Sequence, residues 1–173
     1  MIKRIVRKVD QFVGFDVASA HCDVPCGVYD PIPAQIAAMT VARMTDTIIE
    51  LEGHEVKDHN SGRDHHYQNK IVRMVNEKER SAELVKHEVR IIWGDFYKEP
   101  QFSAHPELHN MVHELMLLTS KCKQNVDQEA SRLLVDKVNH FSEIFWKIKN
   151  ISTYKTKYHC KPNLEIVYPD FKK

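Results

Sequence analysis

The densest group of metal-binding side chains in this chain lies near its start, in the segment HCDVPCGVYDP. His21 stands directly before Cys22, and Cys26 follows four residues later. An imidazole and two thiolates in so short a segment can bind a transition metal. Pro25 restricts the backbone between the cysteines, and Gly27 permits conformations that other residues resist. The segment therefore has the donors and the backbone of a small metal site.

Residues 1–20, which precede this segment, have the features of a removable leader. The first eight residues, MIKRIVRK, are basic, and VASA, which ends at Ala20, resembles a small-residue cleavage site. The stretch between them contains Asp10 and Asp16, which make it too polar for the apolar core of a secretion signal. We therefore predict that a leader-processing protease cuts after Ala20.

Such a cut would create a further ligand, because the nitrogen of His21 would become a free α-amine. The amine, the backbone amide of Cys22 and the thiolates of Cys22 and Cys26 form a planar set of two nitrogens and two sulfurs. Planar donor sets favour Ni(II) or Cu(II), whereas zinc prefers four tetrahedral donors. Anionic thiolates and a deprotonated amide stabilise the higher oxidation state, so that a Ni(II)/Ni(III) couple becomes usable with the His21 imidazole as axial ligand.

The segment HCDVPCGVYDP resembles the N-terminal hook of the nickel-containing superoxide dismutases, whose pattern is H-C-x-x-P-C-G-x-Y. Every fixed position of the pattern is filled, the last by Tyr29. The segments AELVKHEVRIIWGDFYKEPQF, HPELH and IFWKIK resemble further family segments in the same order, so the resemblance covers about residues 19–150. It implies an enzyme that converts superoxide to O2 and hydrogen peroxide by cycling nickel between Ni(II) and Ni(III).

The resemblance also implies roles for individual residues. The implied nickel ligands are His21, Cys22 and Cys26. Tyr29 matches a tyrosine that helps to gate access to the metal, and Asp23 matches a residue that helps to hold the hook. Lys98 matches a lysine that attracts the anionic substrate. The family further implies a homohexamer.

Three positions depart from the family pattern. The glutamate and the arginine that support the axial histidine in the family fall on Ala37 and Ser81, with Arg80 one position earlier. A second family tyrosine falls on Phe96, with Tyr97 adjacent. Because a ligating imidazole is normally oriented by such neighbours, this chain requires a different support for its axial histidine.

Four amphipathic segments after the hook are expected to position it. Apolar residues recur there at helical spacing, over about residues 33–51, 68–97, a stretch that begins near 106, and 127–149. Helices joined by fairly short connections favour an antiparallel arrangement. We therefore predict an all-α fold, an antiparallel four-helix bundle with an N-terminal metal-binding hook.

The expected organisation has three parts. Residues 1–20 are the leader, residues 21–150 the hook and the bundle, and residues 151–173 a C-terminal extension of unknown role. In the extension, the segment LEIVY is compatible with a short strand or with a packed extended segment.

Composition excludes several classes of protein. With 173 residues and a hydrophobic fraction of 42%, the chain can bury a core without disulfides. A net charge of +1 gives no sign of a nucleic-acid partner, and no uncharged apolar run is long enough for a membrane span. Four unevenly spaced cysteines do not form a secreted disulfide scaffold. We therefore expect a cytoplasmic protein.

Other interpretations remain open at the level of sequence. The same hook would suit a non-enzymatic nickel or copper carrier, and a helical interaction module with idle cysteines is a third candidate. His105, His109 and His113 share one helix face, where they fit surface or packing positions better than a zinc site. The histidines near the start of the second helix, His59, His65 and His66, are expected in a solvated loop.

Overall fold

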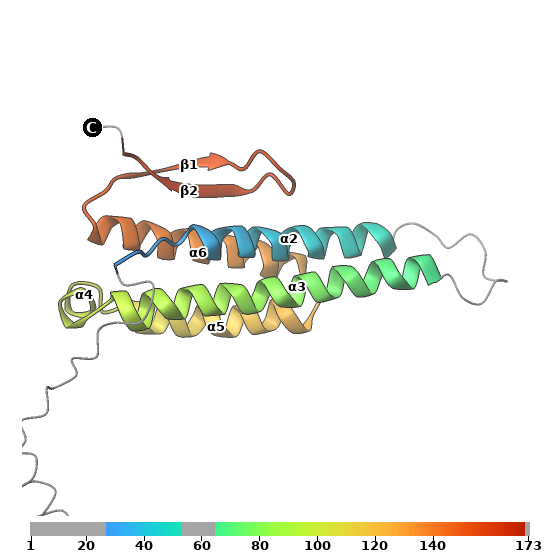
Figure 1. Cartoon of the computed structure of the whole chain (residues 1–173), viewed down its shortest axis with the longest axis horizontal. Coiled ribbons are helices and arrows are strands. Elements are labelled where there is room, and N and C mark those ends of the chain that lie inside the picture. The colour runs from blue at the N-terminus through green and yellow to red at the C-terminus, as the bar shows by residue number, and fades with distance from the viewer. Residues whose placement is uncertain (1–26, 53–64, 172–173) are drawn as a thin grey trace, which may run out of the picture.

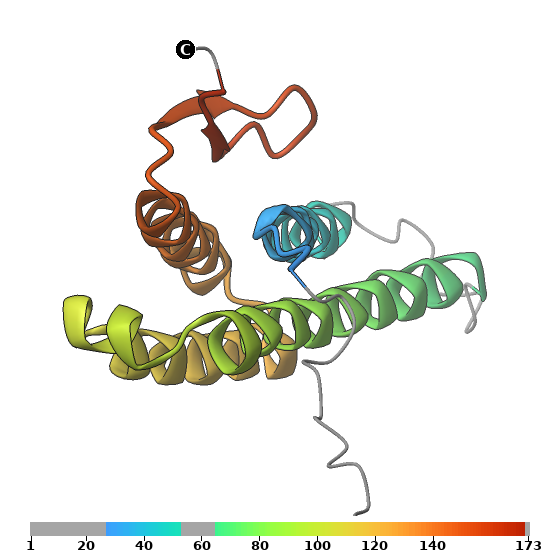
Figure 2. The same cartoon turned by 60° about the vertical axis from the view of Figure 1, so that its left-hand side comes forward.

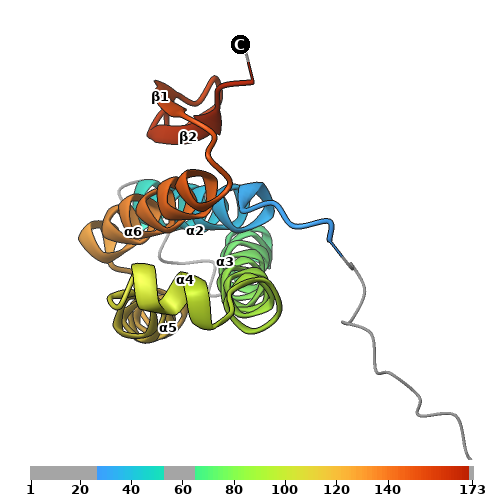
Figure 3. The same cartoon turned by 90° about the vertical axis from the view of Figure 1, so that its left-hand side faces the viewer.

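The computed structural model describes residues 27–52 and 65–171, and this part of the chain is mostly helical (Figure 1). The four long helices are α2 (Ile32–Glu52), α3 (His65–Ile91), α5 (Leu108–Gln124) and α6 (Gln128–Ile148). Helix α2 packs on α3 and α6, and α5 packs on the same two helices. Figure 3 shows two layers, with α2 and α6 in one and α3 and α5 in the other. The four helical segments predicted from the sequence are confirmed.

Helices α2 and α6 begin at signals that are visible in the sequence. The carboxylate Oδ1 of Asp30 accepts a hydrogen bond from the backbone N–H of Ile32 at 2.8 Å, and Pro33 lies in the first turn. Asp127 caps α6, where its Oδ1 accepts from the N–H of Ala130 at 2.9 Å. Both starts agree with the predicted ones to within a residue.

The second predicted helix differs from the observed one at both ends. Helix α3 begins at His65, so His65 and His66 lie in its first turn rather than in a loop. At the other end it continues into a π-helical turn, η1 (Ile92–Phe96). Pro100 does not simply end the helical region, because it lies in the first turn of a further short helix, α4 (Glu99–Ala104), where proline is well tolerated.

The C-terminal extension corrects the all-α expectation. Strands β1 (Thr153–Lys157) and β2 (Glu165–Pro169) form an antiparallel hairpin, in which Lys155 is opposite Val167 (Figure 2). Ile166 and Val167 are buried, and β2 packs on α6. The segment LEIVY is therefore a strand, because its apolar pair covers the side of a helix.

Two buried amides hold the hairpin on the α2–α6 layer. Nε2 of Gln35 in α2 donates to Oδ1 of Asn139 and to the carbonyl of Val167, both at 3.0 Å. Nδ2 of Asn139 in α6 donates to the carbonyl of Glu165 at 2.8 Å, and its Oδ1 accepts from the N–H of Val167 at 3.2 Å. Because both side chains are buried, the hairpin supplies polar partners that water cannot provide.

A buried cation caps the C-terminal end of α5. The ammonium of Lys78, in α3, donates to the carbonyls of Cys122, Lys123 and Asn125 at 2.6, 2.7 and 2.9 Å. These carbonyls lie where a helix runs out of backbone partners and where its dipole favours a positive charge. Burial lowers the pKa of Lys78.

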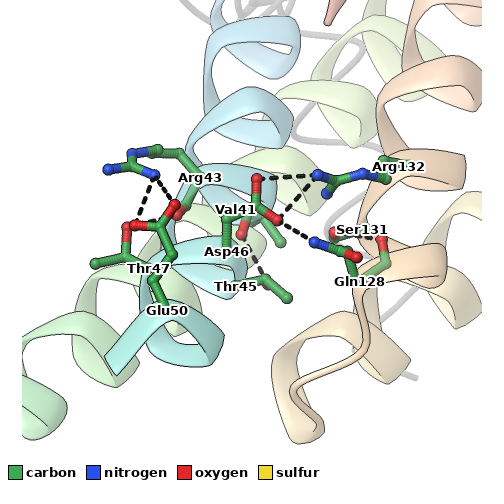
Figure 4. A network of polar contacts seen from close by, with 9 residues as sticks. All are labelled: Val41, Arg43, Thr45, Asp46, Thr47, Glu50, Gln128, Ser131 and Arg132. Carbon is green, nitrogen blue, oxygen red and sulfur yellow. Dashed lines mark hydrogen bonds and ion pairs between the residues drawn. The ribbon is translucent and has the colours of Figure 1, made fainter. Parts of the chain in front are cut away.

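An ion pair joins the later part of α2 to the start of α6 (Figure 4). The carboxylate of Asp46 accepts from Nη2 of Arg132 at 3.0 Å and from Nε2 of Gln128 at 2.8 Å. Burial raises the pKa of Asp46, but these hydrogen bonds and the charges of Arg132 and Arg43 outweigh it, so that the pKa lies below its ordinary value of 3.8.

Asp46→Asn is expected to lower the free energy of unfolding by about 1–3 kcal/mol at pH 7, because it leaves the Arg132 guanidinium without its counter-charge. Since folding lowers the pKa of Asp46, the contribution of the carboxylate is present above the ordinary value and is lost as the pH falls below it. Urea unfolding at pH 7 and at pH 3 measures both effects, with Asp136→Asn, an exposed change on α6, as the control. An equal loss at the two pH values would contradict this assignment.

Candidate metal centre

The described part of the chain begins one residue after the last candidate ligand. His21, Cys22, Cys26 and the supporting Asp23 all lie outside the described residues. Gly27 has a φ of +78°, in the left-handed region that favours glycine, although a Cβ there would meet no atom within 4 Å. The backbone angle, rather than crowding, therefore explains the glycine that follows the second cysteine.

Tyr29 attaches the segment after the hook to an aromatic cluster at one end of the helices. The centre of its half-buried ring lies 5.6 Å from that of Phe96, in η1. The cluster comprises Tyr29, Phe96, Tyr97, Phe102, Phe141 and Phe145. Figure 1 shows that the start of α2, helix α4 and the end of α6 lie toward the same end of the molecule. The chain therefore enters the fold at this end.

The π-helical turn gives neighbouring aromatic residues different surroundings. The N–H of Tyr97 donates to the carbonyl of Ile92 at 3.1 Å, which closes the wide turn. Phe96 packs against Tyr29 and, at 4.9 Å, against Phe145 of α6. Tyr97 is turned into the core, where it is 1% exposed. The departure from the family pattern thus places a phenyl ring, and no hydroxyl, beside Tyr29.

The hydroxyl of Tyr97 is buried and has no hydrogen-bond partner among the residues that the structure describes. Burial raises the pKa of Tyr97, because an ionised phenolate would be poorly solvated there. Tyr97→Phe is therefore expected to leave the free energy of unfolding unchanged or to raise it by about 1 kcal/mol. Urea unfolding of the processed chain, with Tyr154→Phe on the exposed strand as control, measures this. A loss above about 1 kcal/mol would show a partner beyond the described residues.

Lys98 stands at the start of α4 and is exposed. Its backbone N–H donates to Oε1 of Gln101 at 3.0 Å, and its ammonium lies 3.5 Å from the carbonyl of Gly94 in η1. The side chain is thus turned back toward the π-helical turn. Its role in attracting the substrate stays a prediction.

The other two departures leave no supporting pair at the family positions. Ala37 is buried in α2, and its methyl group cannot form a hydrogen bond. In α3, Oγ of Ser81 donates to the carboxylate of Glu77 at 3.1 Å, and Nη2 of Arg80 donates to the same oxygen at 2.6 Å. The polar groups of this stretch are therefore paired within their own helix.

His105, which ends α4, and His109, in the first turn of α5, make packing and surface contacts, as expected. His109 stacks on Phe102 with ring centres 4.1 Å apart, and its Nδ1 accepts from Nε1 of Trp93 at 3.1 Å. Nδ1 of His105 lies 3.1 Å from the carboxylate of Glu107. Over residues 27–52 and 65–171, no three His, Cys, Asp or Glu side chains are grouped to hold a metal ion.

The remaining cysteines, Cys122 and Cys160, belong to no group of metal-binding side chains within the described residues. Burial raises the pKa of the Cys122 thiol to about 11, so that it stays protonated at neutral pH. Cys160 is exposed in the hairpin connection, and both thiols are free. In the same described part of the chain, no helix combines the length and apolar character needed to cross a membrane.

Sequence reasoning missed Lys149, which lies at the aromatic cluster. Its ammonium is 5.2 Å from the ring centres of both Phe96 and Phe145. The available signal was the spacing of Phe145 and Lys149 in FWKIK, four residues apart and thus on one face of α6.

Comparisons with known proteins identify the family that the hook pattern indicates. The profile of the family described as nickel-containing superoxide dismutase matches residues 16–149. A superoxide dismutase [Ni] of Streptomyces seoulensis is 35% identical over 131 residues, which cover 76% of this chain and 89% of the relative. A solved relative is a crystal structure of a Ni-containing superoxide dismutase whose Ni ligation corresponds to the oxidized state. Its sequence is 35% identical to this chain, and the TM-score is 0.61. The match covers 75% of this chain and 99% of that one.

Three further solved relatives are NiSOD mutants. Each carries one substitution: of a histidine at residue 1, of an aspartate at residue 3 or of a tyrosine at residue 9. They are 30–34% identical, with TM-scores of 0.59–0.61, and the matches cover 70–75% of this chain and 99% of each relative. His21, Asp23 and Tyr29 have the same types at the same spacing. With the matching profile, the hook pattern and the shared helical fold together, the chain belongs to the family of nickel-containing superoxide dismutases.

Proposed function

We propose that this chain dismutes superoxide at a nickel ion held by its N-terminal hook, once residues 1–20 have been removed. The observation that carries the proposal is the complete hook pattern, with His21, Cys22 and Cys26 in a chain that belongs to this family. Two superoxide anions and two protons become O2 and hydrogen peroxide. When bound, nickel supplies a one-electron couple between Ni(II) and Ni(III).

The donor set fits nickel on chemical grounds. The α-amine of His21, the amide of Cys22 and the thiolates of Cys22 and Cys26 give two nitrogens and two sulfurs, which suit a square-planar ion. The imidazole of His21 would supply a further nitrogen donor. A thiolate ligand must be deprotonated, so nickel retention is expected to weaken as the pH falls.

The histidine at the first residue of a solved relative supports the proposed cut after Ala20. In that arrangement His21 becomes the chain end. The proposed parts are a leader of residues 1–20, the hook and an antiparallel four-helix bundle over residues 21–150, and a C-terminal extension over residues 151–173. The contacts of α2, α3, α5 and α6 support the bundle.

The chain's own residues have proposed roles in binding and access. Asp23 would help to hold the hook, and Tyr29 would restrict access to the metal. The contact of Tyr29 with Phe96 supports this role, because it fixes the ring at the point where the hook joins the fold. Lys98 attracts the substrate anion from the start of α4.

Assembly into a homohexamer and a cytoplasmic location complete the proposal. Val28, one residue before Tyr29, is 75% exposed, and Ile36 on α2 is 46% exposed. Apolar side chains exposed beside the hook are suited to cover by another subunit. Light scattering of the processed, nickel-loaded protein tests the assembly, and a fully active monomer would refute it.

The direct test uses protein that starts at His21 and is loaded separately with nickel, copper or zinc. We expect one nickel per chain, and rapid superoxide decay in the nickel form alone. Pulse radiolysis measures the decay. Stoichiometric nickel or copper without turnover would identify a carrier. Absence of stoichiometric metal would favour a helical interaction module.

A further inference from the structure

We propose that Lys149, at the end of α6, supplies positive charge that draws the superoxide anion toward the hook. This inference rests on the proposed function and adds a residue to it. Lys149 acts on the substrate anion while it approaches through solution, and it does not bind the metal.

The backbone of Lys149 is fixed by the end of α6. Lys149 is the C-cap, and Asn150 follows in the left-handed conformation with a φ of 58°. The N–H of Asn150 donates to the carbonyl of Lys147, and the N–H of Ile151 donates to that of Trp146, both at 2.9 Å. This pair of bonds is the Schellman motif, which ends a helix in one defined geometry. The starting point of the Lys149 side chain is therefore rigid.

Two aromatic rings then orient the ammonium. It lies 5.2 Å from the ring centre of Phe96 and 5.2 Å from that of Phe145, within the range of a cation–π contact. Tyr29 packs on the same Phe96 ring at 5.6 Å. By the sum of the two distances from Phe96, the Lys149 ammonium lies within about 11 Å of the Tyr29 ring. That separation is comparable with the screening length of about 8 Å in physiological salt.

The charge of Lys149 is not neutralised by a carboxylate within the described part of the chain. The nearest helical carboxylate in sequence, Glu143, is 3.0 Å from the ammonium of Lys155 on β1. Lys147 lines a hollow with Glu143 and the start of the hairpin. Lys149 therefore presents its positive charge beside the Phe96 ring, which also contacts Tyr29. The contacts of Lys98 include no such aromatic support among the described residues.

The first test compares three variants with the parent protein at low ionic strength, all processed and nickel-loaded. Lys149→Met should lower the second-order rate constant for superoxide decay about two- to fivefold, since one charge at this distance changes the local anion concentration by that order. Lys149→Arg should retain the rate. Lys147→Met, the same loss of charge two residues away, should change it less. The Lys149→Met deficit should disappear at 1 M salt, where the screening length is about 3 Å.

The second test needs neither nickel nor turnover. In nickel-free protein with Cys160→Ser, the hook thiols react with a disulfide reagent, forming a mixed disulfide and releasing one aromatic thiolate. We would compare the dianion 5,5′-dithiobis(2-nitrobenzoate) with neutral 4,4′-dithiodipyridine. Lys149→Met should lower the ratio of the two rates about two- to fivefold, and Lys147→Met should not. Any change in thiol pKa affects both reagents and cancels in the ratio.

Each outcome decides one claim. Equal behaviour of Lys149→Met and Lys147→Met in both assays would overturn the role of Lys149, even if the parent protein is an active dismutase. A lower reagent ratio in a protein that does not turn over superoxide would support the position of Lys149 and overturn the proposed function instead. Far-ultraviolet circular dichroism of every variant checks that the overall helical content is unchanged.

Discussion

Replacing Cys22 or Cys26 with serine is expected to abolish superoxide turnover and nickel retention while the helices remain folded. Each change removes an anionic sulfur donor that the higher oxidation state of nickel needs, and a neutral hydroxyl is a poor substitute. The loss should exceed the roughly 10- to 100-fold effect that is typical of residues that only support a ligand. Pulse radiolysis, metal analysis and circular dichroism measure the three quantities.

The other two cysteines provide the matched controls. Cys160→Ser changes an exposed thiol in the hairpin connection, and Cys122→Ser changes a buried thiol at the end of α5. Neither change should alter the nickel stoichiometry. Near-normal turnover in Cys22→Ser or Cys26→Ser would refute the hook, and loss of nickel in a control would place the site elsewhere.

The unprocessed chain is expected to fold its helices and yet lack dismutase activity. While Ala20 remains attached, the nitrogen of His21 is an amide, which is a poor donor at neutral pH until its proton is displaced. The extension would also crowd the space that the His21 imidazole needs in order to bind the metal. Cleavage between Ala20 and His21, followed by nickel, should produce the activity.

Three proteins under the same nickel loading test this requirement: the full chain, a chain that starts at Ala20 and one that starts at His21. The single extra alanine should be nearly as damaging as the whole leader, because it blocks the same nitrogen. If the full chain removes superoxide as fast as the chain that starts at His21, the amine is not a ligand. The far-ultraviolet circular dichroism of all three should agree.

The long helices could be predicted because their apolar residues recur at helical spacing. In α6, Leu134, Val138, Phe141 and Phe145 are all buried, as the pattern requires. The edge of the buried face of α6 was harder to predict. Leu133 fits the apolar pattern but is 48% exposed. A single helix pattern cannot say how wide a face its neighbours cover.

Contacts between segments that are distant in the chain could not be predicted from the sequence alone. The pattern LEIVY did not separate a strand from an extended segment, because the choice depends on Gln35 and Asn139 offering hydrogen bonds. Pro100 indicated the end of one helix and gave no sign that another begins there. For the hook, residue types and spacing identified the family. The contacts of Phe96 with Tyr29 and Phe145 could not be predicted, because these residues come from three separate segments of the chain.

The hairpin has a consequence for when the fold can be completed during synthesis. The hydrogen bond from Gln35 to Val167 spans 132 positions, and it joins the first described helix to the last strand. A ribosome makes α2 long before β2, so the amides of Gln35 and Asn139 keep water as their partner until the end of the chain has emerged. Closing so long a loop is slow compared with forming local helices. The contact between α2 and β2 can therefore form only after nearly the whole chain has been made.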